Sequence, residues 1–215
     1  MEKDLSHHRK TYEKGELRLA DVPENPLELF QKWFYEIERH FPEDENNAMT
    51  ISTLGRDGFP KNRVVLLKRF TYEGFIFYTN YNSDKGKDIQ ASPKVCLSFF
   101  WHGAERQIII KGEAEKIAKN LSDGYFESRP RGSQLGALVS NQSEIVANRA
   151  ILENQLKALE KKYEGKTIPR PKHWGGYMVR PIEFEFWQGR PNRLHDRIRY
   201  RLQKDYSWEI HRLSP

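Results

Sequence analysis

The spacing of apolar positions predicts two helices in this chain. The first covers residues 26–40, with Pro26 in its first turn, where a proline is tolerated because that backbone N–H has no helical partner. Its apolar positions are Leu27, Phe30, Phe34 and Ile37. The second helix, over 144–163, has the clearest helical pattern of the chain. Its apolar stripe consists of Ile145, Ile151, Leu152, Leu156 and Leu159.

Short runs rich in β-branched and aromatic residues predict β-strands. Five such runs precede the long helix, at 48–54, 62–70, 74–80, 94–101 and 106–114. Three more follow it, at 177–187, 198–202 and 206–213. Residues 56–58 and 72–74 each end in glycine and are typical of tight hairpin turns, which require antiparallel neighbours. The sequence therefore predicts a mainly β fold with flanking helices, in which the C-terminal segment completes a barrel or a strongly curved sheet.

Shorter segments connect these elements. Ser83 is suited to cap a helix over 83–91, because its hydroxyl can accept a hydrogen bond from a free backbone N–H of the first turn. Residues 122–130 are predicted to be helical until Pro130 ends the helix. The glycine- and serine-rich segment 131–143 is predicted to be a loop.

The chain is basic, with 36 lysines and arginines against 30 aspartates and glutamates in 215 residues and a net charge of +6. Such a charge suits a nucleic-acid-binding protein and equally an enzyme whose ligands carry phosphate. No run of five like charges occurs, so we expect no basic binding tail. The chain also lacks the glycine-rich patterns G-x-G-x-x-G and G-x-x-x-x-G-K-[ST], which excludes the two common nucleotide-binding loops.

Cysteine and histidine usage argues against a disulfide or a metal site. The single cysteine, Cys96, excludes an internal disulfide, and its apolar neighbours predict a buried thiol. The seven histidines show no metal-binding spacing. No stretch approaches eighteen apolar residues, and the first residues contain no apolar signal core. We therefore expect a cytoplasmic protein with no metal and no membrane partner.

Basic residues that interrupt an apolar strand are candidates for binding an anion. Arg63 and Lys68 lie in the run R-V-V-L-L-K, which contains no acidic residue, so a bound anion would balance their charge. The alternative is that both residues mark the solvated ends of the strand.

A second candidate site lies where F-Y-T-N leads into the helix capped by Ser83. Tyr78, Thr79, Ser83 and Lys85 surround the N-terminus of this helix, where backbone N–H groups favour phosphate. Capping of the helix without any ligand is the alternative.

The segment Y-F-E-S-R-P-R-G-S is a third candidate. Tyr125 and Arg129 are one helical turn apart, and Ser133 follows in the next segment. A tyrosine, an arginine and a serine together suit a phosphate clamp, in which the arginine supplies a planar pair of donors. The alternative is an ordinary polar surface.

The segment F-E-F-W-Q-G-R-P-N-R-L-H-D-R, residues 184–197, combines aromatic and basic side chains. As a strand it places its two phenylalanines on one face and Trp187 on the other, where a flat aromatic ligand can stack. If the alternation continues, Arg193, His195 and Arg197 point to one side.

Together these motifs resemble the pyridoxamine 5′-phosphate oxidase family, over nearly the whole chain. The family signature is F-E-F-W-Q followed, after four residues, by R-L-H-D-R. R-V-V-L-L-K, F-Y-T-N, E-R-Q, S-R-P-R-x-S-Q-x-G-A and N-Q-S agree independently, as does the leader R-K-T-Y-E-K-G-E-L. Residues 1–22 are polar and charged, so we expect a flexible N-terminal segment. The resemblance implies a single FMN-binding split β-barrel domain, 23–215. A dimerisation and active-site segment would begin at about residue 170.

The resemblance also implies a homodimer with FMN at the subunit interface. The implied FMN positions are Arg63, Val64, Lys68, Tyr78, Thr79, Lys85, Gln107, Gln142, Ser143, Trp187 and Arg197. The implied substrate positions are Lys68, Tyr125, Arg129, Ser133, Arg193 and His195, of which Arg193 and His195 are the implied catalytic residues. One position departs from the family pattern, because Asp84 stands where a base is common beside the flavin phosphate. Asp84 could instead cap the helix or face solvent.

The implied reaction is the oxidation of pyridoxine or pyridoxamine 5′-phosphate to pyridoxal 5′-phosphate, with O₂ reduced to H₂O₂. Three other functions are possible for such a sequence. The intact set Arg129, Ser133, Arg193 and His195 argues against a split-barrel flavoprotein that only reduces or carries flavin. A nucleic-acid-binding barrel would present one exposed basic stripe with stacking aromatics, whereas the basic residues here form discrete clusters, so we expect no nucleic-acid partner. A carrier would bind pyridoxal phosphate without consuming oxygen.

Overall fold

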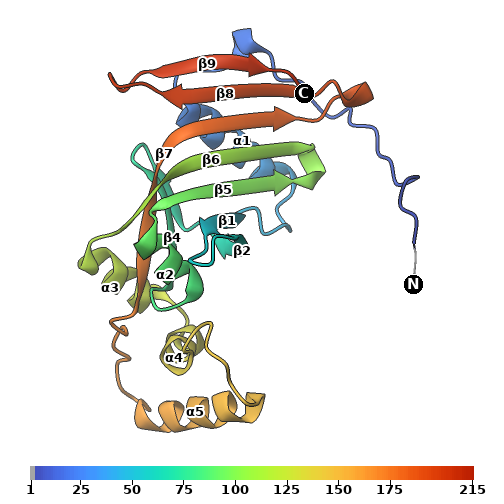
Figure 1. Cartoon of the computed structure of the whole chain (residues 1–215). Helices are drawn as coiled ribbons and strands as arrows, with labels where there is room; N and C mark the ends of the chain where they lie inside the picture. The colour runs from blue at the N-terminus through green and yellow to red at the C-terminus, as the bar shows by residue number, and fades with distance from the viewer. Residues whose placement is uncertain (1–2) are drawn as a thin grey trace. The chain divides into compact units, whose positions relative to one another are not determined.

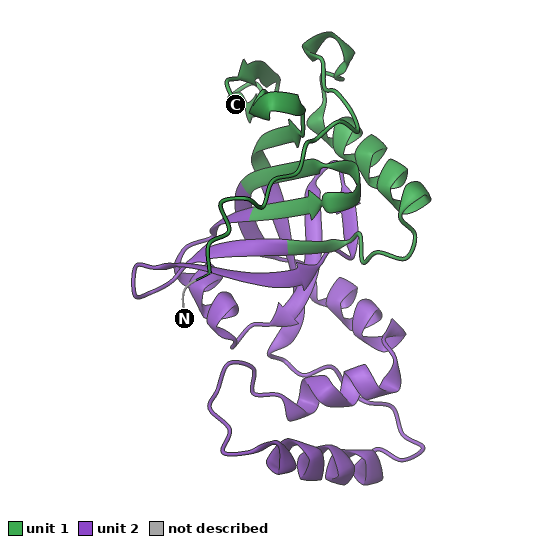
Figure 2. Cartoon of the chain, turned by 90° about the vertical axis from the view of Figure 1, so that its right-hand side faces the viewer, with its two compact units in different colours: residues 1–49, 97–111, 181–215 green, residues 50–96, 112–180 purple. Residues whose placement is uncertain are grey.

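The computed structural model describes residues 3–215, which form two compact units (Figure 2). Unit 1 comprises residues up to 49, 97–111 and 181–215, and unit 2 comprises 50–96 and 112–180. Strands β1 (Ala48–Leu54), β5 (Lys94–Trp101), β6 (Arg106–Lys116) and β7 (Trp174–Gln188) contribute residues to both units. The chain is mainly β with flanking helices, as predicted.

Hydrogen bonds connect nine strands in the order β2-β1-β5-β6-β7-β4-β3, and β8 and β9 continue from β7 (Figure 1). The long strand β7 has two antiparallel partners in succession. Its first half pairs with β4 (Gly74–Asn80), from Asn80↔Trp174 to Phe75↔Val179. Its second half pairs with β8 (Asp196–Leu202), from Glu183↔Arg201 to Gln188↔Asp196, and β8 pairs with β9 (Trp208–Leu213).

Unit 1 has a core between helix α1 (Pro26–His40) and the strands. The Asn25 side chain accepts a hydrogen bond from the Leu27 N–H and so caps the helix. All four predicted apolar positions are buried. Phe30 contacts Phe99 with ring centroids 5.3 Å apart, and Trp33 contacts Phe186 at the same distance. Unit 1 also contains the short 3-10 helices η1 (Leu19–Asp21), η2 (His102–Ala104) and η3 (Pro191–Arg193).

Unit 2 contains β2 (Pro60–Leu66), β3 (Arg69–Thr71) and four helices. These helices are α2 (Asp84–Ala91), α3 (Lys119–Ser128), α4 (Arg131–Val139) and α5 (Arg149–Lys162). The single strand predicted over 62–70 is divided between β2 and β3, because β2 pairs with β1 whereas β3 pairs with β4. The predicted cap of α2 is confirmed, since Ser83 Oγ accepts a hydrogen bond from the Gly86 N–H.

The loop predicted over 131–143 is wrong for its first nine residues, which form α4. Leu135 is buried against Phe126 and Trp174, and this tertiary packing outweighs the low helix propensity of the two glycines. The helix predicted over 144–163 begins only at Arg149, because the Asn148 side chain caps it by accepting the Ile151 N–H.

Three other side-chain predictions need correction. Ile145 lies outside α5 and is fully exposed, so it is not part of the apolar stripe, of which Leu156 and Leu159 pack on the core. Cys96 is half-buried, because the alternation along β5 places Val95 and Leu97 on the buried face. Arg193 lies in η3, before β8 begins, so it does not continue the strand alternation of Arg197.

Candidate functional site

A cavity of about 480 Å³ in unit 2 collects most of the residues predicted to bind a phosphorylated ligand. The ends of β2 and β4, the first turn of α2, and the junction of α3 and α4 converge on it. The predicted residues that line it are Val64, Lys68, Tyr78, Thr79, Lys85, Tyr125, Arg129, Ser133 and Gln142. Three separate sequence motifs therefore meet in one cavity of a size that is usual for small-molecule sites.

Lys85 is a buried cation at the N-terminus of α2. Its Nζ lies 3.4 Å from both Ser83 Oγ and Gln142 Oε1, which are long distances for hydrogen bonds of an ammonium group. Burial lowers the pKa of Lys85, the Arg63 guanidinium lowers it further, and Asp84 acts in the opposite direction. A buried ammonium with two weak partners favours an anion in this cavity.

Arg63 has a partner within the chain. Its Nη1 donates to Thr53 Oγ1 at 2.7 Å, and its Nη2 lies 3.7 Å from Asp88 Oδ2. Thr53 Oγ1 in turn donates to Asp88 Oδ2 at 2.9 Å. Arg63 therefore has an acidic partner from outside its own strand, in addition to any anion that binds there. Burial nevertheless lowers the pKa of Arg63, because it outweighs the opposing effect of Asp88.

Arg129 lines the same cavity and contacts a group of stacked aromatic rings. Tyr78 stacks on Tyr125 with ring centroids 3.9 Å apart, and Trp174 lies nearly parallel to both rings. The Arg129 guanidinium lies 4.5 Å from the centroid of Trp174. Its Nη1 is buried and has no hydrogen-bond partner within residues 3–215. Burial lowers the pKa of Arg129, although Tyr125 opposes this change.

The loop after α4 is attached to β4 and to α2. Gln142 Oε1 accepts a hydrogen bond from Thr79 Oγ1 at 3.4 Å. Ser143, which has a positive φ of 76°, accepts the Asp84 N–H on its hydroxyl at 3.2 Å. Asp84 itself is exposed, and Ser83, not Asp84, caps the helix. The helix-capping alternative for Asp84 is therefore wrong.

The remaining predicted residues lie in unit 1. Arg193 and His195 line a second cavity, of about 540 Å³, and the Trp187 ring centroid is 4.7 Å from that of His195. Arg197 Nε donates to Glu185 Oε1 at 2.8 Å, and this hydrogen bond raises the pKa of Arg197. Gln107 lies at the start of β6 and is not among the residues that line either cavity.

The second cavity also contains residues that were not singled out as site residues. His8, Arg9, Lys10, Thr11 and Tyr12 line it from the N-terminal segment. The stretch R-K-T-Y in the leader was the available signal, because its basic and aromatic residues match the chemistry of the C-terminal motif. Trp174 was missed in the first cavity because it precedes the strand predicted over 177–187.

No helix within residues 3–215 is both long enough and apolar enough to span a bilayer.

Comparisons with known proteins agree on one family. Residues 38–163 match the family described as pyridoxamine 5′-phosphate oxidase, and residues 174–215 match the pyridoxine 5′-phosphate oxidase C-terminal dimerisation region. A pyridoxine/pyridoxamine 5′-phosphate oxidase from Flavobacterium psychrophilum is 66% identical over 99% of this chain and 100% of its own length. One from a Nostoc species is 50% identical, over the full length of both chains.

Solved structures show the same fold. The crystal structure of PhzG from Burkholderia lata matches with a TM-score of 0.85 at 27% identity, over 91% of this chain and 95% of that chain. A pyridoxamine 5′-phosphate oxidase-related, FMN-binding protein from Nostoc punctiforme matches with a TM-score of 0.70 at 14% identity, over 91% and 99%. At that identity the second likeness concerns the fold alone.

Proposed function

This chain belongs to the pyridoxamine 5′-phosphate oxidase family, and we therefore propose that it oxidises pyridoxine and pyridoxamine 5′-phosphate to pyridoxal 5′-phosphate. Its fold is the FMN-binding split β-barrel of that family. FMN, when bound, supplies the redox chemistry by taking two electrons from the C4′ carbon and passing them to O₂, which becomes H₂O₂. The amine substrate also consumes one water and releases ammonia.

The observation that carries this proposal is the pair of cationic positions in the cavity of unit 2. Lys85 is buried with two weak partners, and Arg129 has a buried Nη1 without a partner among the described residues. A buried cation without a strong partner is costly unless an anion binds to it. The cofactor and the substrate each carry one phosphate, so two such positions suit two phosphorylated ligands.

The residues around Lys85 fit FMN. The N-terminus of α2 supplies a favourable dipole for a phosphate, and Thr79 and Gln142 offer a hydroxyl and an amide beside it. The exposed Val64 lines the same cavity and offers apolar contact to a flat ring. The other proposed cofactor residues are Arg63, Lys68, Tyr78, Gln107, Ser143, Trp187 and Arg197.

The substrate phosphate would bind at the junction of α3 and α4. There Arg129 supplies the planar donors, Tyr125 and Ser133 supply hydroxyls, and Lys68 supplies a further charge. Arg193 and His195 would contact the pyridine end of the substrate.

We further propose that the active unit is a homodimer with FMN at the subunit interface. The match of residues 174–215 to a dimerisation region supports a dimer, and this region carries Trp187, Arg193, His195 and Arg197. The single-domain assignment of 23–215, the flexibility of 1–22 and the cytoplasmic location stay predictions.

The absorption spectrum of the purified protein, followed by turnover in air, tests the function. We expect flavin bands, and with pyridoxine 5′-phosphate we expect aldehyde and peroxide in equal amounts. Flavin bands without turnover would instead indicate a split-barrel protein that reduces or carries flavin. A protein that takes up no FMN even when FMN is supplied would contradict the proposed cofactor.

Asp84 is expected to weaken FMN binding, because its exposed carboxylate lies at the first position of α2, next to Lys85. Replacing Asp84 with asparagine should tighten FMN binding about fivefold at low salt, which corresponds to about 1 kcal/mol for a surface charge. Replacing it with arginine should tighten it further, and added salt should reduce both gains.

Quenching of FMN fluorescence during titration of the apoprotein measures this affinity. Asp57→Asn, which removes an exposed acid from the turn between β1 and β2, is the matched control. Equal affinities of the Asp84 variants and the wild type at low salt would show that this charge does not act on the cofactor.

A further inference from the structure

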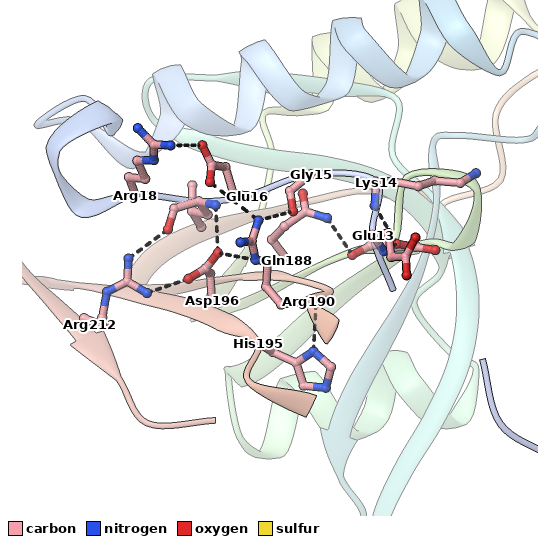
Figure 3. A network of polar contacts seen from close by, with 12 residues as sticks. Glu13, Lys14, Gly15, Glu16, Arg18, Gln188, Arg190, His195, Asp196 and Arg212 are labelled. Carbon is pink, nitrogen blue, oxygen red and sulfur yellow. Dashed lines mark hydrogen bonds and ion pairs between the residues drawn. The ribbon is translucent and has the colours of Figure 1, made fainter. Parts of the chain in front are cut away.

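The turn between β7 and β8 brings His195 back against the main chain of Arg190. Asn192 and Arg193 both have positive φ angles, of 55° and 61°, which are unfavourable for residues other than glycine. This conformation reverses the chain so that the Arg190 backbone nitrogen lies 3.0 Å from His195 Nδ1 (Figure 3).

This hydrogen bond determines where the imidazole carries its proton. A backbone N–H can only donate, so Nδ1 of His195 must accept and cannot carry a proton itself. A neutral imidazole then has its single proton on Nε2. Protonation of Nδ1 would set two N–H groups against each other and break the contact with Arg190.

The surroundings of His195 also disfavour a second proton. The side chains of His8, Arg9, Lys10 and Arg193 line the same cavity, and no carboxylate is among its lining residues. Burial lowers the pKa of His195, and the charge of Arg193 lowers it further. The rings of Tyr12 and Trp187 cover the imidazole without adding charge.

Three contacts hold the Arg190 side chain in place (Figure 3). Its Nη1 donates to the Gly15 carbonyl at 3.0 Å and lies 3.6 Å from Glu16 Oε2, and its Nε lies 3.6 Å from Asp196 Oδ2. Asp196 is held in turn, because it accepts the Leu17 N–H at 3.0 Å and Arg212 Nη1 at 2.6 Å. The Asp196 carboxylate is thus directed at Arg190, Leu17 and Arg212.

Asp196 remains ionised over the pH range in which enzymes of this kind work. Burial raises the pKa of its carboxyl group, but the hydrogen bonds from Leu17 and Arg212 outweigh this and lower the pKa below its ordinary value. The contacts of the Asp196 carboxylate with Arg190, Leu17 and Arg212 are therefore fully formed above the ordinary pKa of an aspartate. They are lost only as the pH falls through the lowered pKa of Asp196.

We propose that Arg190 and Asp196 are positioning residues that hold His195 as a neutral imidazole with its proton on Nε2. His195 would then donate a hydrogen bond to an oxygen at the pyridine end of the substrate and would not act as a base. Its basic nitrogen, Nδ1, is already occupied by the Arg190 N–H. The substrate contact rests on the proposed function, whereas the position of the proton does not.

NMR spectroscopy of the FMN-loaded protein with ¹⁵N-labelled histidine tests the position of the proton directly. The His195 signals are assigned by their absence from the His195→Gln protein. We expect a protonated Nε2 and an unprotonated Nδ1 between about pH 6 and pH 8, where a free histidine would titrate. A proton on Nδ1, or an imidazolium ring at pH 7, would overturn the proposal.

The positioning role of Asp196 is tested in the same experiment. Asp196→Asn should give a mixture of both tautomers, because the asparagine cannot pair with Arg190 as a carboxylate does. Asp205→Asn, an exposed site in the turn between β8 and β9, should leave the His195 signals unchanged. If the His195 signals of the Asp196→Asn protein equal those of the wild type, Asp196 does not position His195.

Turnover of His195 variants distinguishes a hydrogen-bond donor at this position from a base. Glutamine keeps an N–H donor near the place of Nε2, so His195→Gln should retain turnover within about tenfold and keep the wild-type pH profile. His195→Ala should lose about 100-fold or more, the usual cost of removing a positioned hydrogen-bond donor. If glutamine is as inactive as alanine at equal FMN content, the donor role is wrong. If the wild type has no turnover, the proposed function fails, and the NMR result stands by itself.

Discussion

Replacing Arg129 with leucine is expected to lower kcat/KM for both phosphorylated substrates by about 100-fold to 1,000-fold. Arg129 lines the cavity of unit 2, and its buried Nη1 has no partner among residues 3–215. A bound phosphate would accept hydrogen bonds from the guanidinium, and each charge-assisted bond contributes about 1.5–3 kcal/mol. Two such bonds account for the expected loss.

The same substitution should leave the thermal stability of the ligand-free protein almost unchanged. Leucine removes a partnerless buried donor, which stabilises the folded state by about 1–3 kcal/mol. It also removes the stacking of the guanidinium on Trp174, a loss of about 0.5–2 kcal/mol. The two effects on stability oppose each other, so Arg129→Leu should lose activity without a matching loss of thermal stability.

Steady-state kinetics and calorimetry of the same preparations check both statements. Arg149→Leu is the matched control in unit 2, because its side chain is 87% exposed and pairs only with Glu153 on the surface of α5. Arg129→Lys should recover part of the activity, since it restores the charge but not the planar pair of donors. Unchanged kcat/KM in Arg129→Leu would show that this residue does not hold the substrate phosphate.

Replacing Arg193 with leucine should lower turnover by about 100-fold to 10,000-fold while the protein keeps most of its FMN. Arg193 lies in the turn η3 and lines the same cavity as His195, and neither Lys85 nor Arg129 is among the residues that line this cavity. Its loss would leave the pyridine ring without a partner that orients C4′, and misplaced reacting groups are costly to the rate.

Flavin absorbance per protomer and turnover, measured on one sample, distinguish a loss of turnover from a loss of FMN. Arg201→Leu is the control in unit 1, since this arginine on β8 is 58% exposed and lies 3.8 Å from Glu183. Turnover equal to the wild type would defeat the assignment of Arg193. Loss of FMN in proportion to the loss of turnover would assign Arg193 to the cofactor instead.

The sequence predicted those parts of the fold that depend on neighbouring residues. Helix α1 was predicted from a proline in the first turn and four apolar positions at helical spacing. The cap of α2 by Ser83 and the burial of Phe184 and Phe186 on one face of β7 were predicted in the same way. Each depends on residues within one or two turns of a helix or along one strand.

Predictions failed where distant segments decide the outcome. The two glycines of α4 are typical of a loop, and the helix forms because Leu135 packs on Phe126 and Trp174. A bound anion was predicted as a partner of Arg63 because no acid lies in its own strand, yet Asp88 of α2 also lies close to it. Neither contact follows from a local pattern.

By itself the sequence determined the family, most of the helices and strands, and nine of the residues that line the cavity of unit 2. These are encoded by residue identity and by spacing along the chain. Only the tertiary structure decided which charges have partners, that Lys85 and Arg129 do not have strong ones, and that the proton of His195 belongs on Nε2. Charge pairing and proton position depend on atoms within a few ångströms, and only the folded chain determines which atoms those are.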